Sequence, residues 1–320
     1  MASSARHANQ GAALPAPAFV LVTKDVALPE RGAGTFHVVH SPPSRAIKSH
    51  LLLFHGAGLT VQSFAAMVQA LPSTIGVWAF DCRGHGRTTV EPAEDWTLDT
   101  LVKDANALLD HFAWRQPAAP PCFLVGHSMG GCVAIRAAWK DVKGLVVIDA
   151  VEGVALSSLD AGAHFVETRP AEFASVDDAV AWSLTYGPLR GAYSAKLSVP
   201  DQVVHNGHAF VWRTDLKRTI PFWPEWFTGA SNAFIEAPCA KLLILAGVEK
   251  LDTPLSAAHM MGKYQLVVMP SVAAGHFVHE DAPGLTVGAI AHFVNRQLGA
   301  PKGGMTAEQV IALQKQMTQR

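Results

Sequence analysis

Short apolar runs without alternation recur along the chain, separated by segments with apolar residues at helical spacing. The runs lie at residues 51–54, 77–80, 123–125, 145–148, 242–245 and 266–269. A continuous run is typical of a parallel strand covered on both faces, because a half-buried strand would alternate. Residues 97–112 carry apolar side chains at helical spacing. This alternation predicts an α/β fold with a doubly wound, mostly parallel sheet, and the stretch 36–39 predicts an antiparallel strand at its edge.

The alternation stops between residues 152 and 237, where a helical pattern at 176–185 is flanked by prolines expected to break helices. These prolines stand at 170, 188, 200, 221, 224 and 238. Because ligands bind at the carboxyl ends of the strands in such a sheet, we expect the segment to form a helical cap over that edge. Most of its many aromatic residues predict a core of its own. The stretch 222–227 is too rich in aromatic surface for a short segment to bury, so Trp223 and Trp226 are predicted to bind substrate or a protein partner.

The domain organisation follows from these patterns. One core domain is predicted over residues 20–298, with the cap at 152–237 as its insertion. Residues 1–19, rich in Ala, Ser and Pro, predict a disordered tail. The last core helix is expected to begin near Pro283 with Asp281 as its N-cap. Residues 299–320 predict a C-terminal tail with a short amphipathic helix.

Composition narrows the classes of function. Of the 320 residues, 49% are hydrophobic and 16% are charged, which indicates a well-buried globular protein. A net charge of −1 gives no long-range field, so neither nucleic acid nor an anionic membrane surface is an expected partner. No apolar segment approaches the ~18 residues of a membrane span. The four cysteines and the histidines show no metal-binding spacing, so we expect no metal and a reducing compartment, the cytoplasm, with the nucleus as a second location.

The strongest chemical signal is Gly126-His127-Ser128-Met129-Gly130, which follows an apolar run and precedes a segment of small residues. A strand, Gly-x-Ser-x-Gly and a helix, in that order, are the context of the nucleophile elbow of α/β-hydrolases. Glycines flank the serine because side chains at those positions would crowd a sharp, strained turn. Ser128 is therefore the predicted nucleophile, at the carboxyl edge of the sheet.

A serine hydroxyl needs a base to remove its proton and an acid to orient that base. In this fold the three groups follow the order serine, acid, histidine. His276 comes after the last apolar run and is favoured over His279, which already lies at the start of a helix. Asp149 and Asp252 are both candidates for the acid, because each follows a predicted strand. Spacing does not choose between them.

Two backbone N–H groups are needed to stabilise an oxyanion at such a site. The N–H of Met129, directly after the nucleophile, is the first candidate. The second is the N–H of Ala57, because the segment 55–58, His-Gly-Ala-Gly, resembles the HGGG-type loop of this fold with one glycine replaced. A glycine-rich turn at 81–88 is expected to support the site and not to hold phosphate.

Several segments together resemble the protein phosphatase methylesterase 1 family. They are 51–58, 126–131, 147–153, 212–213, 241–247 and 275–283. The resemblance implies a cofactor-independent serine carboxylesterase that removes the methyl ester from the C-terminal leucine of the protein phosphatase 2A catalytic subunit, its partner. By motif it implies that Ser128 is the nucleophile, Asp149 the acid and His276 the base. Ala57 departs from the glycine that is usual in the family.

Two other functions are compatible with the same residues. The fold and its three catalytic groups also serve enzymes that act on small esters, because neither determines the substrate. A non-catalytic protein that binds and sequesters the phosphatase is the other alternative. It is disfavoured, because binding alone would not require an elbow, an acid and a histidine together.

Overall fold

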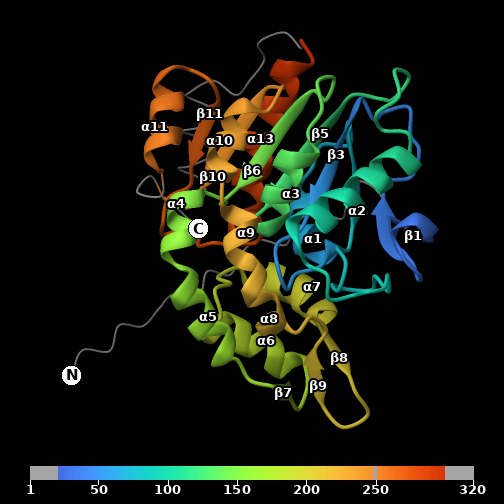
Figure 1. The fold of residues 1–320 in the computed structure, drawn as a ribbon, viewed down its shortest axis with the longest axis vertical. Helices are drawn as coiled ribbons and strands as arrows, with labels where there is room; N and C mark the ends of the chain where they lie inside the picture. The colour runs from blue at the N-terminus through green and yellow to red at the C-terminus, as the bar shows by residue number, and fades with distance from the viewer. Residues whose placement is uncertain (1–20, 248–250, 300–320) are drawn as a thin grey trace.

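A mostly parallel sheet organises the structure (Figure 1), and the computed structural model describes residues 21–247 and 251–299. Its eight described strands, in sheet order, are β1 (Val22–Val26), β2 (Phe36–His40), β4 (Ile75–Phe80), β3 (Ser49–Phe54), β5 (Cys122–His127), β6 (Gly144–Ile148), β10 (Lys241–Leu245) and β11 (Gln265–Val268). β2 pairs antiparallel with both neighbours, and all pairs from β4 to β11 are parallel. The α/β-hydrolase fold predicted from the sequence is confirmed.

The predicted apolar runs correspond to β3, β4, β5, β6, β10 and β11. The prediction for residues 36–39 was wrong in one respect. β2 is antiparallel, but it lies inside the sheet because β1 pairs along its outer side. β1 reads Val-Thr-Lys-Asp-Val and is exposed at every residue except Val26, which is typical of a solvated edge strand.

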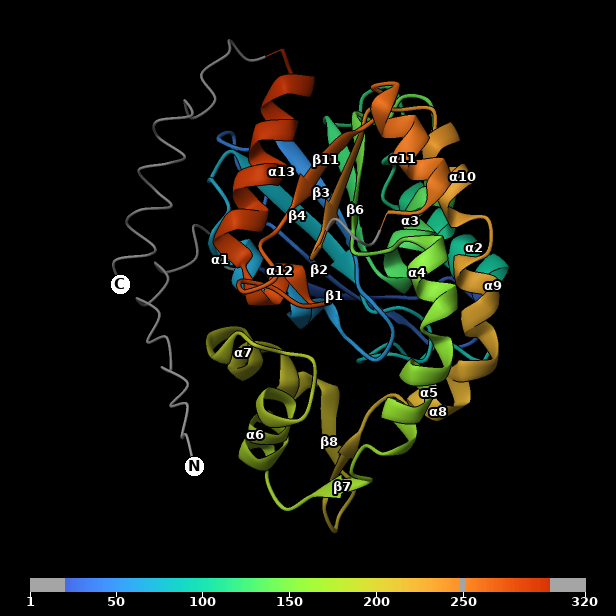
Figure 2. The same ribbon diagram turned by 90° about the vertical axis from the view of Figure 1, so that its left-hand side faces the viewer.

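Helices cover both faces of the sheet (Figure 2). One face carries α1 (Ala65–Gln69), α12 (Val278–Asp281) and α13 (Pro283–Gln297), and the other carries α2 (Leu98–His111), α3 (Met129–Ala137), α10 (Ala230–Glu236) and α11 (Thr253–Met260). Alternate side chains of β3 supply the two cores: Leu52 and Phe54 pack on the side of α2 and α3, and Leu51 and Leu53 on the side of α1 and α13. Both faces are buried, which is why the run shows no alternation.

The segment between β6 and β10 contains the elements that surround the site, and Figure 2 shows most of them below the main sheet. They are α4 (Glu152–Ser157), α5 (Leu159–Glu167), β7 (Glu172–Phe173), α6 (Val176–Thr185), α7 (Ala192–Gln202), β8 (Val203–His205), β9 (Phe210–Trp212), α8 (Leu216–Thr219), α9 (Trp223–Phe227) and α10. α6 occupies the predicted helical stretch. Pro200 lies inside α7, so the helix break expected there is absent. The tails predicted at 1–19 and 299–320 lie outside the described residues, apart from Gly299.

The sequence predicted Asp281 as the N-cap of the last core helix, and this prediction was wrong. Ala282 stands at the N-cap of α13. The Asp281 carboxylate instead accepts hydrogen bonds from the backbone N–H groups of Arg190 at 2.8 Å and Gly191 at 3.2 Å in the cap. Its other oxygen accepts from the N–H of Gly275 at 2.8 Å. A tertiary contact, tying the loop before His276 to the cap, therefore replaces the local one.

A buried ion network holds the glycine-rich turn at 81–88. Asp104 on α2 is 1% exposed and accepts hydrogen bonds from Nε and Nη2 of Arg83, both at 2.8 Å. Nε of Arg31 donates to the same carboxylate at 2.7 Å. In the turn itself, the Asp81 carboxylate accepts from the backbone N–H groups of Val61 and Arg87 at 2.8 and 2.9 Å. These contacts join the turn to α2 and to the loop after β3.

We expect Asp104→Asn to lower the free energy of unfolding by about 3–5 kcal/mol, because it leaves the buried Arg83 guanidinium without its counter-charge. Urea denaturation followed by circular dichroism measures the change. The matched control is Asp99→Asn on the same helix, whose exposed pair with Lys103 is worth about 0.5 kcal/mol or less. Similar small losses in both variants would contradict the structural role of Asp104.

Candidate active site

Ser128 lies in the turn between β5 and α3 with φ 52° and ψ −123°, a strained conformation for a residue with a side chain. Close backbone packing on both sides maintains it. A Cβ at Gly126 would lie 2.3 Å from the carbonyl oxygen of Gly130, and a Cβ at Gly130 would lie 2.2 Å from that of Phe54. The glycines predicted to flank the nucleophile are therefore required by contact, because no side chain fits at either position.

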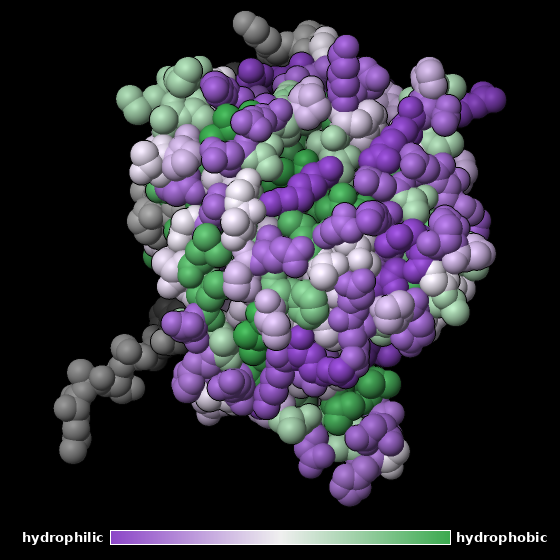
Figure 3. Space-filling model, in the orientation of Figure 1, coloured by the Kyte–Doolittle hydropathy of each residue, from purple (hydrophilic) through white to green (hydrophobic). Residues whose placement is uncertain are grey.

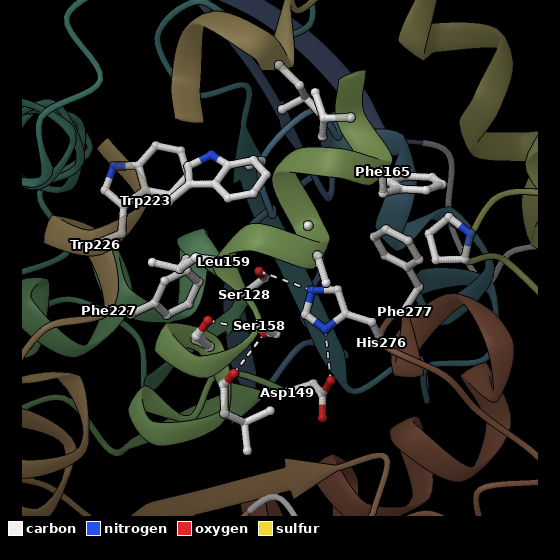
Figure 4. A pocket seen from close by; sticks show the side chains of 18 of the residues that line it. Ser128, Asp149, Ser158, Leu159, Phe165, Trp223, Trp226, Phe227, His276 and Phe277 are labelled. Carbon is white, nitrogen blue, oxygen red and sulfur yellow. Dashed lines mark hydrogen bonds and ion pairs between the residues drawn. The ribbon is translucent and has the colours of Figure 1, made fainter. Parts of the chain in front are cut away.

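Ser128, His276 and Asp149 lie in one hydrogen-bonded series (Figure 4). Nε2 of His276 is 3.2 Å from Oγ of Ser128, and Nδ1 of His276 is 2.8 Å from Oδ2 of Asp149. The carboxylate side chain is 3% exposed, whereas the imidazole side chain is 43% exposed. An imidazole held this way at Nδ1 can accept the serine proton at Nε2. The structure brings together the three residues that the sequence singled out.

The two candidate acids have different partners. Asp149 directly follows β6, and its Oδ1 accepts a hydrogen bond from the N–H of Ala246 at 3.1 Å. Asp252 caps α11 by accepting from the N–H of Leu255 at 3.0 Å. Its other oxygen accepts from the N–H of Gly153 at 3.3 Å and from the hydroxyl of Ser231 at 2.5 Å. Asp149 is thus the carboxylate beside the histidine, and Asp252 ties α4 and α10 to α11.

The loop after β3 lies against the elbow. A Cβ at Gly56 would lie 3.3 Å from Cβ of Ser128. Buried His55 fixes the loop: its Nε2 accepts from the N–H of Cys82 at 2.9 Å, so Nδ1 carries the proton and donates to the carbonyl of Gly56 at 2.8 Å. Burial lowers the pKa of His55 to about 4. The ring is neutral at physiological pH and sets the loop without adding a charge.

Ala57 and Met129 present backbone N–H groups beside the nucleophile. Ala57 lines the same cavity as Ser128, and Met129 is the first residue of α3. Within the described residues, neither N–H has a hydrogen-bond acceptor. The first N–H groups of a helix lack intrahelical acceptors, and two such donors can stabilise a developing oxyanion.

Two buried histidines lie behind His276. Nε2 of His127 donates to the backbone carbonyl of His276 at 3.0 Å, and the ring of His279 packs on that of His127 with centroids 4.5 Å apart. Burial, followed by the neighbouring imidazoles, lowers the pKa of both, to about 3 for His279. Both rings are therefore neutral, and His127 positions the loop that carries His276.

Sequence reasoning missed how this loop is positioned. His127 was noted only as part of the elbow motif, and Asp281 was expected only to cap a helix. The bond from His127 to His276 spans 149 residues, and that from Arg190 to Asp281 spans 91. No periodicity or local motif reports contacts of this kind, because they exist only after the two ends of the domain have packed.

A cavity of about 590 Å³ opens beside Ser128. Apolar side chains dominate its walls. They include Val154 and four residues labelled in Figure 4: Leu159, Phe165, Phe227 and Phe277. Among the described residues that line it, Asp149 is the only acidic one and none is Lys or Arg. α4 has no buried residue, and Figure 3 shows hydrophobic side chains gathered on the surface near α4 and α5. The site thus presents to a ligand a mainly apolar chamber whose described walls carry no Lys or Arg.

Both predicted tryptophans line this cavity, with different accessibility. Trp223 is half-buried, and its indole N–H donates to the Thr219 hydroxyl at 2.9 Å. Trp226 is 1% exposed and belongs to the core around α2 and α3. Its indole N–H donates to the carbonyl of Trp96 at 2.7 Å. Trp223 therefore offers a ligand more surface than Trp226 does.

Residues 21–247 and 251–299 were searched for metal-binding groups and for helices that could span a membrane. No group of three or more His, Cys, Asp and Glu side chains there is arranged to hold a metal ion. None of the helices in those ranges has both the length and the apolar character needed to cross a membrane.

The fold and the elbow define an α/β-hydrolase. The model of the α/β-hydrolase family matches residues 51–289. E-2-(Acetamidomethylene)succinate hydrolase superposes with a TM-score of 0.72 at 20% identity, covering 86% of this chain and 100% of that one. The thioesterase domain from the curacin biosynthetic pathway gives 0.65 at 17% identity, covering 85% and 99%. These structures support the fold alone.

Relatives found by sequence show to which family of α/β-hydrolases the chain belongs. Protein phosphatase methylesterase 1 of Schizosaccharomyces pombe is 40% identical over 268 residues, covering 80% of this chain and 78% of the relative. The protein of the same name from Bos taurus is 34% identical over 325 aligned positions, covering 86% and 84%. The chain belongs to the protein phosphatase methylesterase 1 family, and it is an enzyme of the serine hydrolase type.

We expect Asp149→Asn to lower kcat by about 10⁴-fold, because the amide cannot hold the productive tautomer or stabilise the imidazolium. Asp252→Asn is the matched control, since that carboxylate caps a helix and does not contact His276. Asn caps helices about as well as Asp, so the expected change in stability is less than about 1 kcal/mol, with kcat within a few-fold of wild type. Ester hydrolysis under saturating substrate measures both, and a larger loss in Asp252→Asn would exchange the two roles.

Stability is expected to depend on pH through Glu280, which is fully buried on α12. Burial, together with the neighbouring Asp281 carboxylate, raises the pKa of Glu280 from 4.5 to about 8. The folded state therefore keeps a proton that the unfolded state releases, so this contribution to stability is complete below pH 4.5 and is lost as the pH rises to about 8.

Glu280→Gln, which stays neutral, tests this expectation. The difference in unfolding free energy between wild type and variant should move in favour of the variant as the pH rises from 5 to about 8. Urea denaturation at several pH values measures it. Subtracting the variant removes the common contributions of His127 and His279, whose lowered pKa values act in the opposite direction below pH 6.5. A difference that is constant with pH would contradict a protonated Glu280.

Proposed function

We propose that this protein is a serine carboxylesterase that hydrolyses the methyl ester of the C-terminal leucine of the protein phosphatase 2A catalytic subunit. The observation that carries the proposal is the series Asp149–His276–Ser128 at the floor of an apolar cavity. A leucine methyl ester brings an apolar side chain and an uncharged carbonyl to that floor, which suits walls without Lys or Arg. The name shared by the relatives supports a phosphatase as the bearer of the ester.

The first half of the reaction forms an acyl-enzyme. Oγ of Ser128 attacks the ester carbonyl while Nε2 of His276 takes the hydroxyl proton, and Asp149 stabilises the imidazolium. The N–H groups of Ala57 and Met129 stabilise the oxyanion of the tetrahedral intermediate, each by about 3–4 kcal/mol. When the intermediate collapses, the bond to the methoxy oxygen breaks, and His276 gives that oxygen its proton so that methanol leaves.

The second half regenerates the enzyme. A water molecule loses a proton to Nε2 of His276 and attacks the acyl carbon, passing through a second oxyanion held by the same two N–H groups. Collapse breaks the bond to Oγ of Ser128, which recovers the proton from His276. The products are methanol and a free C-terminal carboxylate, and the whole sequence uses only protein groups and water, so no cofactor enters it.

A phosphatase tail must reach Ser128 past the cap, so cap residues are expected to contact the substrate. Trp223 is the stronger candidate of the two predicted tryptophans, because Trp226 is buried in the core and has little surface left for a substrate. The free cysteines of the described residues suit a reducing compartment, so we propose the cytoplasm as the location of the protein, with the nucleus as a second location.

Methanol release from a carboxymethylated phosphatase catalytic subunit tests the proposal. Wild type should release one methanol per methylated subunit, and Ser128→Ala should lower kcat by on the order of 10⁶-fold. A fluorophosphonate should label wild type and leave Ser128→Ala unlabelled. Short p-nitrophenyl esters measured in parallel report intrinsic esterase activity.

The outcomes separate the three candidate functions. A lower kcat/KM for the methylated phosphatase than for the small esters would favour an enzyme of small-molecule metabolism. Phosphatase binding with neither fluorophosphonate labelling nor methanol release would favour a sequestering protein. Only methanol release that depends on Ser128 supports the methylesterase.

A further inference from the structure

Two smaller cavities lie beside the catalytic cavity, under the cap. The inner one, about 70 Å³, shares Ala57, Phe165 and Leu216 with the catalytic cavity. The outer one, about 310 Å³, shares Leu216 with both. The Leu216 side chain lies against Gly58, where an added Cβ would meet its Cδ1 at 2.7 Å. A single side chain thus borders all three spaces, and the smaller two begin where the chamber beside Ser128 ends.

Arg169, just beyond α5, lines both smaller cavities. Its guanidinium carbon lies 3.7 Å from the centroid of the Trp212 ring. Trp212 is itself fixed, because its indole N–H donates to the carbonyl of Pro170 at 2.9 Å and its ring packs edge-on against Phe173 and Trp182. A guanidinium stacked on the face of an indole leaves the N–H groups at its own edges free to donate hydrogen bonds.

Within the described residues, the Arg169 side chain makes no hydrogen bond or ion pair, although it is half-buried. The buried Arg83, in contrast, has Asp104 as its partner. Asp215 is the nearby carboxylate, but it accepts from the backbone N–H of Lys217. Burial lowers the pKa of Arg169 to about 10, so the group is still a cation at physiological pH.

Gln202 supplies a second unused donor in the same place. It is 8% exposed and lines the inner cavity with Arg169. Its Nε2 is buried without a hydrogen-bond partner among the described residues. A buried amide donor left unpaired is destabilising because it has lost its hydrogen bond to water, and an acceptor group in the cavity would remove that cost. An amide and a guanidinium both lacking acceptors point to a ligand that brings oxygen atoms.

We propose that Arg169 and Gln202 form a subsite that binds the carboxylate of an acidic side chain in the peptide substrate, upstream of the esterified residue. The proposal rests on the methylesterase function. The catalytic cavity has no Lys or Arg among its described lining residues, whereas the adjoining space has a cation with its donors unused. A substrate that fits both is apolar at the ester and acidic a short distance along the chain. Carboxylates bind guanidinium groups by paired, charge-assisted hydrogen bonds, and the inner cavity has room for a group of that size.

Matched peptide methyl esters test the subsite. Each peptide ends in leucine methyl ester and carries Glu one, two or three residues before it, and each has a control with Gln at that position. Wild type should show a kcat/KM at least tenfold higher for the Glu peptide at one placement. A ratio below twofold at all three placements would overturn the proposal.

Substitutions assign the preference to the named residues. At the best placement, Arg169→Gln should bring the ratio of kcat/KM for the Glu peptide to that for its Gln control to within twofold of unity. Arg169→Lys should restore part of this preference. Arg169→Glu should invert the preference, so that a further peptide with Lys at that position becomes the better substrate. Gln202→Leu should lower the ratio severalfold. The control is Lys217→Gln, an exposed cation that lines only the outer cavity and should leave the ratio unchanged. Equal losses of the Glu preference in Arg169→Gln and Lys217→Gln would show that it comes from general attraction to nearby positive charge. That result would overturn the subsite.

Two measurements keep the outcomes distinct. Thermal unfolding of each variant shows whether it is folded, and the wild-type peptide series decides the proposal even if Arg169→Gln does not fold. Methanol release from peptides without any preference for Glu would overturn the subsite and leave the methylesterase function standing. Release from none of the peptide or protein methyl esters would instead remove the methylesterase function on which the subsite rests.

Discussion

The close approach of three backbone segments at the elbow is the constraint on which the site depends. Ser128 is held at φ 52° because α3 packs directly onto the ends of β3 and β5, with Gly130 against the carbonyl of Phe54 and Gly126 against that of Gly130. A strained serine persists only where its surroundings over-determine it. Here the surroundings are two buried central strands and the helix packed on them, so the stability of the core and the exposure of the nucleophile have the same origin.

The remaining catalytic groups are positioned from outside the elbow. Asp149 extends from the neighbouring strand β6, while His276 sits in a loop held by His127 from the sheet and by Asp281, which also binds the cap. Apart from Asp149, three buried ionisable groups around this loop are neutral: burial lowers the pKa of His127 and His279 and raises that of Glu280. Asp149 is thus the negative charge that the imidazolium faces most closely, which makes its contribution to the transition state large.

The cap divides its aromatic residues between two tasks. Trp226 and Trp212 are anchored by indole hydrogen bonds to backbone carbonyls, and they support neighbouring groups as well as their own packing. Phe165, Trp223 and Phe227 face the cavity beside Ser128. The chamber next to the nucleophile is apolar, and the cation Arg169 lies in the adjoining cavity beyond Leu216. We expect this difference between the two cavities to select the substrate.

The sequence by itself determined the parallel sheet, the elbow and the identity of the nucleophile and the base, because continuous apolar runs and a Gly-x-Ser-x-Gly turn are local signals. It left Asp149 and Asp252 equivalent by spacing, and only the resemblance favoured Asp149, since each follows a strand that ends at the same edge. Tertiary structure decided that one contacts His276 and the other caps α11. It also placed β1 outside β2 and joined Asp281 to the cap and to the loop of His276. In the part of the chain that the structure describes, it left the Arg169 side chain without a hydrogen-bond acceptor. These contacts join residues far apart in the chain, so they depend on how separate segments pack, which no local pattern of hydrophobic and polar residues encodes.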